Sequence, residues 1–510
     1  MATTEYKTPG VYLVEKNAFP TSVVEVLTAV PVFVGYTEKS MEGTRNVAGA
    51  PVRLTAMREF VSTFGGARRP QLDIRTGTTI DAAELQYVEG PRYLLHDSMQ
   101  LFFDNGGGPC YVVSVGDFKT PIAGEKLWND DVKNALEREL EPTMIVIPEA
   151  TQVGHDAWQT ISNAVLLHCT DMMSRVTILD VVGGDAPKPD GVSEANHVLN
   201  QSTAFRNALT PDKPSYGVAY YPWLRTTIVS DSEIDFRSLS KAARDALIAA
   251  TIADATKRFA NSPKLQTVQT AADKVSAYAD DAPPAGADLE AFFVQHRVLV
   301  TASPVYKAVM DAVKPHLNLL PPSAAMAGVY ARIDSLFGVF KAPANTGLNS
   351  VVAPAMNITH DEQMDLNVPL DGKAINAIRS LPGRGLVVWG ARTLDGNSQD
   401  WRYVNVRRTM IMLEQSIKAA AQAYVFQPNT ATTWVTVQAM IVNYLTNKWK
   451  EGALMGTTSE EAFGVTVGLG STMSGNDILD GYMRVTIKVA IVRPAEFIEL
   501  TFVQQMQSVA

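Results

Sequence analysis

Cysteine and histidine are scarce in this sequence, and that scarcity argues against two kinds of site. Two cysteines, Cys110 and Cys169, in 510 residues are too few for a disulfide framework. Both lie in apolar surroundings, where a small thiol is usually buried, so we expect inert core cysteines. The seven histidines are scattered. His168 and Cys169 are neighbours on a predicted helix and point apart, so packing or capping explains His155, His168, Cys169 and Asp171 better than a metal site.

Long apolar runs and basic clusters are also absent. No stretch approaches the ~20 uninterrupted apolar residues of a membrane helix, and the segment MATTEYKTPG has no basic region followed by an apolar one. We therefore expect a cytoplasmic protein without direct membrane insertion. Asp and Glu outnumber Lys and Arg by 53 to 44, which gives a net charge of -9. No basic stripe suits a phosphate backbone, so nucleic acid is not an expected partner.

Motifs of catalysis and of nucleotide binding are incomplete. FFDNGGGPCYVV lacks the Lys-Ser/Thr pair of a phosphate-binding loop and is typical of a glycine turn between a helix and a strand. VGLGSTMSGND lacks the third glycine of a dinucleotide fingerprint and is typical of a hairpin loop. No Gly-x-Ser-x-Gly nucleophile elbow occurs. We therefore expect no catalytic residue, no cofactor and no enzymatic activity.

The composition is that of a folded protein, with 46% hydrophobic and 19% charged residues, and the length indicates two or three domains. TMIVIPEA predicts a strand, the following HDAWQTISNAVLLHCTDMMSRV a helix, and VTILDVVGGD a second strand. That order is typical of a β-α-β crossover, so the first half should hold an α/β layer. Residues 230–320 have mainly helical periodicity.

Two further helices are predicted near the C-terminus, followed by paired strands. The first, over 403–424, has an apolar stripe of Met410, Leu413, Ile417, Ala420, Ala421 and Tyr424, with Arg408, Gln415, Lys418 and Gln422 facing the other way. The second ends near Gly452, which can cap it. It places Trp434, Val437, Ile441 and Leu445 inward and Thr436, Asn443, Asn447 and Lys450 outward.

Both ends of the chain have strand-forming sequence, KTPGVYLVEK and VRPAEFIELTFVQQMQSVA. Chain ends usually fray unless something holds them, so strand-forming sequence at both ends calls for an explanation. Arg493 and Pro494 precede the second strand, and proline is tolerated at strand beginnings because it cannot donate to a ladder.

Several motifs occur in an order that resembles the contractile tail sheath family of bacteriophages, R-type pyocins and extracellular contractile injection particles. The resemblance is carried by TPGVY, VPVFVGYT, FFDNGG, YYPW, LPPSAAMAGVYARIDS, FKAPANTG, VVWGARTLDG, WRYVNVRR, EGAL and VRPAEFIELTF. Together they span both ends and most of the chain, whereas residues 225–315 carry little of the pattern.

The resemblance implies a mixed α/β (α+β) protein of several domains. An inner α/β domain would be built from C-terminal and N-terminal segments, and an outer α/β domain would carry a helical insertion. Along the chain we expect an N-terminal arm (1–22), an outer domain (23–225), a variable helical part (226–344), an inner domain (345–492) and a C-terminal strand arm (493–510).

The implied function is mechanical. Hexameric rings of sheath subunits would stack around an inner tube and contract to drive it through a target envelope. The arms would add strands to sheets of neighbouring subunits, with the strand residues Val11, Tyr12, Leu13, Val14, Phe497, Ile498, Leu500 and Phe502. Asn443, Asn447, Lys448 and Lys450 are the predicted contacts with the tube, although lysines in a last helical turn also simply favour the helix dipole.

The implied partners are other copies of the chain, an inner tube protein, baseplate and terminator or cap proteins, and related sheath subunits where a particle has more than one. The resemblance leaves open whether the particle is a phage tail, a released injection particle or one anchored in the producing cell. A non-contractile tail or capsid shell protein would share the strand exchange but show one lattice state. An α/β enzyme would need a polar cluster in a cleft, which the sequence does not offer.

Overall fold

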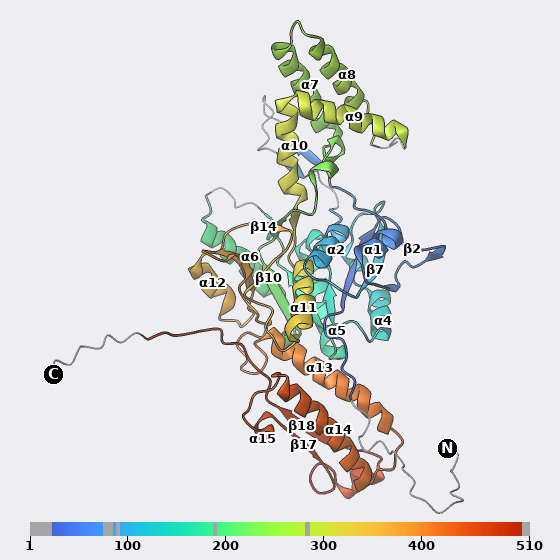
Figure 1. The fold of residues 1–510 in the computed structure, drawn as a ribbon, viewed down its shortest axis with the longest axis vertical. Helices are drawn as coiled ribbons and strands as arrows, with labels where there is room; N and C mark the ends of the chain where they lie inside the picture. The colour runs from blue at the N-terminus through green and yellow to red at the C-terminus, as the bar shows by residue number, and fades with distance from the viewer. Residues whose placement is uncertain (1–22, 75–84, 88–91, 187–190, 281–285, 502–510) are drawn as a thin grey trace, which may run out of the picture. The chain divides into compact units, whose positions relative to one another are not determined.

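The structure is a computed structural model that describes residues 23–74, 85–87, 92–186, 191–280 and 286–501 (Figure 1). The described residues form two compact units, each presented by itself. The main unit comprises 27–411 and 493–501, and the C-terminal unit comprises 23–26 and 412–492. Helices and strands occur in both units, which confirms the predicted mixed α/β class. The strand predicted at Val11 to Val14 lies outside the described residues.

The main unit is built around a nine-stranded sheet, in the order β13-β16-β15-β10-β9-β8-β1-β7-β4. Parallel pairing joins the neighbours β15, β10, β9, β8, β1 and β7. Antiparallel strands complete the edges, with β4 beside β7 and with β16 and then β13 beside β15. The strands are β1 (Pro31–Thr37), β4 (Pro51–Leu54), β7 (Cys110–Asp117), β8 (Met144–Val146), β9 (Val176–Asp180), β10 (Gly217–Tyr221), β13 (Thr346–Gly347), β15 (Asn376–Leu381) and β16 (Gly385–Val388).

The central strands are buried because helices cover the sheet. Every residue of β1, β8, β9 and β10 is buried, as expected for continuous apolar strands in a parallel sheet. The predicted β-α-β crossover is confirmed, since α5 (His155–Met172) joins the parallel strands β8 and β9. The other helices near the sheet are α1 (Met57–Phe64), α2 (Leu95–Asp104), α3 (Gly124–Leu127), α4 (Asp130–Arg138), α6 (Glu194–Ala208), α11 (Ser323–Phe337) and α12 (His360–Asn367).

The sheet continues past residue 345, where we expected a domain boundary. β13, β15 and β16 follow that residue, yet β15 pairs with β10 and so extends the sheet begun by the first half of the chain. The division between the two units falls instead within α13 (Val404–Ala421), between residues 411 and 412. Strand pairing between distant segments depends on how the chain returns in space, which local sequence patterns do not encode.

Four helices form an insertion with an apolar core of its own. They are α7 (Lys241–Arg258), α8 (Pro263–Ser276), α9 (Ala287–Ala302) and α10 (Pro304–Leu317), coloured green to yellow in Figure 1. Their buried residues, among them Leu247, Val268, Leu299 and Val313, form a cluster separate from that of the sheet. The helical periodicity predicted for this stretch is confirmed.

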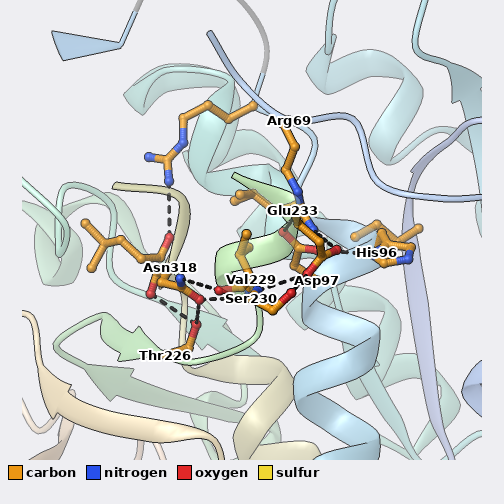
Figure 2. A network of polar contacts seen from close by, with 12 residues as sticks. Arg69, His96, Asp97, Thr226, Val229, Ser230, Glu233 and Asn318 are labelled. Carbon is orange, nitrogen blue, oxygen red and sulfur yellow. Dashed lines mark hydrogen bonds and ion pairs between the residues drawn. The ribbon is translucent and has the colours of Figure 1, made fainter. Parts of the chain in front are cut away.

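Polar contacts tie the insertion to the sheet layer at its base (Figure 2). The guanidinium of Arg69 lies between Asp97 on α2 and Glu233, and the Glu233 carboxylate is 3.0 Å away. Asn318, which follows α10 where the chain leaves the insertion, accepts from the Val229 amide at 2.8 Å and donates to the Val229 carbonyl at 3.0 Å. Both chain connections of the insertion are therefore fixed at this junction.

Short sheets complete the main unit. β11 (Leu224–Thr226) pairs with β12 (Leu319–Leu320) and with β14 (Val351–Pro354), and the hairpins are β2 (Met41–Glu42) with β3 (Arg45–Asn46) and β5 (Leu72–Ile74) with β6 (Leu85–Tyr87).

The first turns of α13 correct one prediction. Arg408, expected on an outward face, is buried, and its guanidinium donates to the Asp334 carboxylate at 2.6 and 3.0 Å and to the Thr28 carbonyl at 3.0 Å. The same guanidinium lies 4.6 Å from the ring centre of Tyr330. Helical periodicity separated two faces of the helix but could not show that α11 packs against the charged one.

The C-terminal unit is built from the second half of α13, the helix α14 and a hairpin. α14 (Ala431–Lys450) packs against the antiparallel pair β17 (Phe463–Val467) and β18 (Val485–Val489), red in Figure 1, with the short helices α15 (Ser459–Ala462) and α16 (Gly475–Leu479) in the connections. Gly452 follows α14 with φ +85°, which confirms the predicted cap. Val437, Ile441 and Leu445 are buried as predicted, and Trp434 is half-buried.

Candidate functional site: an open sheet edge and the roots of the chain ends

The outer edge of β18 is open among the described residues. The Ala490 amide donates to the Ala462 carbonyl at 2.9 Å, which shows that even-numbered residues of this strand turn their backbone groups toward β17. Because backbone directions alternate along a strand, Val485, Ile487 and Val489 turn theirs the other way. Within the described part of the chain the sheet contains β17 and β18 alone, so these backbone groups have no strand partner there.

One face of this hairpin packs inward and the other is exposed. Val485, Ile487 and Val489 are half-buried, whereas Thr486 and Lys488 are exposed. The opposite edge is less accessible, because the Gln438 side chain of α14 donates to the Val465 carbonyl of β17 at 2.8 Å. The β18 edge is therefore the side of the hairpin on which a further strand can pair.

Three of the four predicted tube contacts are exposed on α14. Asn443, Asn447 and Lys450 have exposed side chains, and their spacing of four and three residues places them on one helical stripe.

Lys448 is occupied within its own subunit. Its side chain is 11% exposed and forms ion pairs with Glu25 and with Glu451, the latter at 2.6 Å. Burial by itself would lower the pKa of Lys448, but the two carboxylates outweigh that effect and raise it. The charge therefore ties Glu25 to α14, and we drop Lys448 from the proposed tube contacts.

The C-terminal tail has the composition of a strand but pairs with no strand in the described part of the chain. Residues 493–501 have no assigned secondary structure, and Phe497, Ile498 and Leu500 are 74%, 78% and 73% exposed. Phe502 lies outside the described residues.

Glu496 fixes the root of this tail to the main unit. Its carboxylate accepts from the Arg392 guanidinium at 3.0, 3.1 and 2.6 Å, from the Asn367 amide at 2.6 Å and from the Tyr403 hydroxyl at 2.9 Å. Burial by itself would raise the pKa of Glu496, but these hydrogen bonds and the Arg392 charge together lower it. The carboxylate is therefore ionised at neutral pH.

Of the side chains considered for metal binding, His168 and Cys169 are core residues, as is Cys110, whereas His155 and Asp171 are exposed. Cys110 and Cys169 are fully buried, and burial raises both thiol pKa values, that of Cys169 to about 12. The ring of His168 is also buried, 5.3 Å from the ring of Trp128. In the described part of the chain, no three His, Cys, Asp or Glu residues are grouped as a metal would require. The FFDNGGGPCYVV segment joins α2 to β7, and VGLGSTMSGND lies between β17 and β18.

Comparison with known families decides the relationship of this chain. The family model "Phage tail sheath protein central domain" matches residues 239–394, and the model "Phage tail sheath C-terminal domain" matches residues 397–505. Together they cover just over half of the chain. The chain belongs to the phage tail sheath family.

Solved sheath structures match this family member over its whole length. The sheath of the PVC extracellular contractile injection system, in the contracted state, is 26% identical with a TM-score of 0.58, and the match covers 99% of each chain. The contracted helical sheath of the anti-feeding prophage (AFP) is 27% identical with a TM-score of 0.58, and the match covers 98% of this chain and 100% of that one. The AFP baseplate structure contains a chain 27% identical, with a TM-score of 0.57 and coverage of 98% and 100%.

A curated relative matches over a shorter stretch. The tail sheath protein of Salmonella phage ViI is 31% identical over 128 residues, which is 24% of this chain and 20% of that protein. The match thus spans about a fifth of the length of the phage protein.

The sheath motifs found in the sequence meet in the structure. Arg392 of WGARTL, Tyr403 of WRYVN and Glu496 of RPAEF form one cluster of hydrogen bonds. Tyr330 and Asp334 of AGVYARID meet Arg408 of the RR pair. These contacts were not predicted, and the signal that could have found them is the presence of charged residues inside otherwise apolar motifs.

Proposed function

We propose that this chain is the structural subunit of a contractile sheath, which assembles with copies of itself around an inner tube and shortens to drive the tube through a target envelope. One observation carries the proposal: the subunit has both an open strand edge on β18 and a strand-patterned tail whose apolar side chains are exposed. An acceptor edge and a donor strand on one chain allow identical subunits to link in series.

The strength of such a link follows from its backbone bonds. An added strand that makes about six hydrogen bonds at roughly 0.5–1.5 kcal/mol each contributes about 3–9 kcal/mol per link. Apolar side chains covered by the neighbour add to that value. Links of this strength, repeated along a lattice, hold subunits together while they change their packing.

Contraction requires contacts that differ between an extended and a shortened lattice, because only differential interactions shift a conformational equilibrium. In the proposed mechanism, subunits in stacked hexameric rings rotate as nearly rigid bodies and the chain ends act as hinges. The PVC and AFP sheaths, which are similar over the whole chain, were both solved in a contracted state, and this supports contraction over a static shell. The family is structural, which supports a mechanical rather than an enzymatic role.

The proposed partners are further copies of the chain, the inner tube protein, and baseplate and terminator proteins. The similarity to a chain in the AFP baseplate structure supports the baseplate contact. Asn443, Asn447 and Lys450 on α14 are the proposed tube contacts. Assembly in the cytoplasm of the producing cell fits this proposal, and no described helix is long and apolar enough to cross a bilayer.

The test is to express the chain alone and examine it by negative-stain electron microscopy, beside a variant truncated after Glu496. We expect long striated tubes from the full chain and discrete particles from the truncated one. Two lattice states with different pitch distinguish a contractile sheath from a static shell. Equal tube formation by both chains would contradict strand donation by the tail, and a monomer that tolerates removal of residues 1–16 and 497–510 in every assay would contradict the sheath proposal.

A further inference from the structure

The root of the C-terminal tail is held unusually firmly for a segment that pairs with no described strand. The Glu496 side chain is 19% exposed and its partner Arg392 only 3%, whereas the tail residues directly after it are exposed. Five hydrogen bonds converge on this one carboxylate. The tail therefore changes from fixed to exposed within one residue.

The partners of Glu496 come from three separate places in the main unit. Asn367 is the last residue of α12, Arg392 follows β16, and Tyr403 directly precedes α13. Three segments thus hold one carboxylate: Asn367 donates to one oxygen, Tyr403 to the other, and Arg392 to both.

Arg392 is itself held in place by the sheet. The Asn376 side chain of β15 accepts from the Arg392 amide at 2.7 Å and donates to the Arg392 carbonyl at 2.7 Å and to the Ala219 carbonyl of β10 at 3.0 Å. The Arg392 guanidinium also donates to the Asn367 carbonyl at 3.2 Å. The anchor of Glu496 is therefore continuous with the central sheet.

We propose that Glu496 is a positioning residue that sets the register in which the tail pairs with the β18 edge of a second copy of this chain. This inference rests on the proposed function. Side chains alternate along a strand, so a slip of one residue exchanges the face of Ile498 and Leu500 for that of Phe497. Because Glu496 directly precedes these residues, the contacts that fix its carboxylate prevent the donated strand from shifting along its axis.

Loss of the anchor should lengthen the free segment without removing the strand that pairs. Register would then depend on side-chain contacts alone, and pairings shifted by two residues would become populated. An isosteric Glu496→Gln substitution keeps the shape but removes the charge that holds the Arg392 guanidinium in a forked contact. Arg392→Lys keeps the charge but cannot form that fork.

The test maps register by cross-linking between copies. Assembled sheaths are made from two chains, one with Ile498→Cys or Phe497→Cys and the other with Thr486→Cys or Lys488→Cys. The native cysteines Cys110 and Cys169 are buried and do not compete. With Glu496 intact, we expect one cysteine pair to cross-link about fivefold or more over the pair shifted by two residues.

Glu496→Gln and Arg392→Lys should bring that ratio close to one, and the melting temperature of each monomer is measured beside it because the loss of a buried ionic partner also lowers stability. Glu499→Gln, an exposed carboxylate on the same tail, is the matched control and should leave the ratio unchanged. Tyr403→Phe removes a single hydrogen-bond donor and should give an intermediate cross-linking ratio. The test therefore still works if the variants with larger changes fail to fold. If Glu496→Gln, Arg392→Lys and Tyr403→Phe all leave the cross-linking ratio unchanged, the register role is overturned. If no cross-link forms while Glu496 is intact, strand donation itself is overturned.

Discussion

At the scale of single residues, His168 shows how burial decides the character of a titratable group. Its ring is 1% exposed, and burial, together with the charges of Arg175 and Lys133, lowers its pKa to about 4. The folded state holds this histidine in its neutral form, whereas in the unfolded chain the ring binds a proton with a pKa near 6.5. Stability is therefore lost as the pH falls from 6.5 toward 4.

His168→Leu should remove this dependence on pH. For the unchanged chain, we expect this residue to cost about 2–3 kcal/mol of unfolding free energy between pH 7 and pH 4. Urea unfolding of monomers at both pH values measures it, with substitution of the exposed His360 as the control. A loss in the Leu variant as large as in the unchanged chain would show that other groups carry the acid sensitivity.

Lys450 tests the proposed tube contact at the same scale. It is exposed at the end of α14, and complementary charge mainly sets the rate and selectivity of association. Lys450→Glu should reduce co-assembly with the inner tube protein at low salt, measured as the fraction of tube that sediments with sheath. Lys418→Glu, exposed on α13, is the matched control. Normal co-assembly of the Lys450 variant would remove this residue from the interface.

At the scale of elements, the direction of each backbone group on β18 gives a sharp test of strand addition. The Ile487 amide points away from β17, so Ile487→Pro removes no bond of the hairpin but removes a donor from the outer edge. We expect this variant to fold as a monomer and to form no tubes, judged by circular dichroism and electron microscopy.

The neighbouring position supplies the contrast. Thr486→Pro removes an amide that points toward β17, and should lower the melting temperature of the C-terminal unit. Tubes from the Ile487→Pro variant that match those of the unchanged chain would place the added strand elsewhere on the subunit.

At the scale of the whole molecule, the junction in Figure 2 decides whether the helical insertion moves with the sheet layer. Arg69 is 17% exposed and pairs with Asp97, which is 9% exposed, and with Glu233. Arg69→Ala leaves these carboxylates without their shared cation and should cost about 3 kcal/mol of unfolding free energy.

Hydrogen exchange localises the effect. Faster exchange at residues 229–233 and 318–320, with the core of α7 to α10 unchanged, would indicate an insertion that has loosened as a body. Arg45→Ala removes an exposed pair with Glu42 and should change neither exchange nor stability. Uniform acceleration over the whole chain would instead show that Arg69 supports the global fold.

The sequence by itself determined the class of the protein, the crossover near its middle strands, the helical character of residues 230–320, the last two long helices, and its family. These follow from local periodicity and from motif order, which the chain carries in every conformation. The crossover through α5 and the inward face of α14 were both predicted from such patterns.

Only the tertiary structure decided which polar residues meet. Glu496, Arg392 and Tyr403 are separated by up to 104 residues, and no periodicity relates them. The tertiary structure likewise buried Arg408, which its helix alone would place at the surface, paired Lys448 with Glu25, and joined β15 to β10. The physical reason is that local patterns record which face of an element is apolar, whereas contacts between charged groups depend on how elements far apart in sequence pack together.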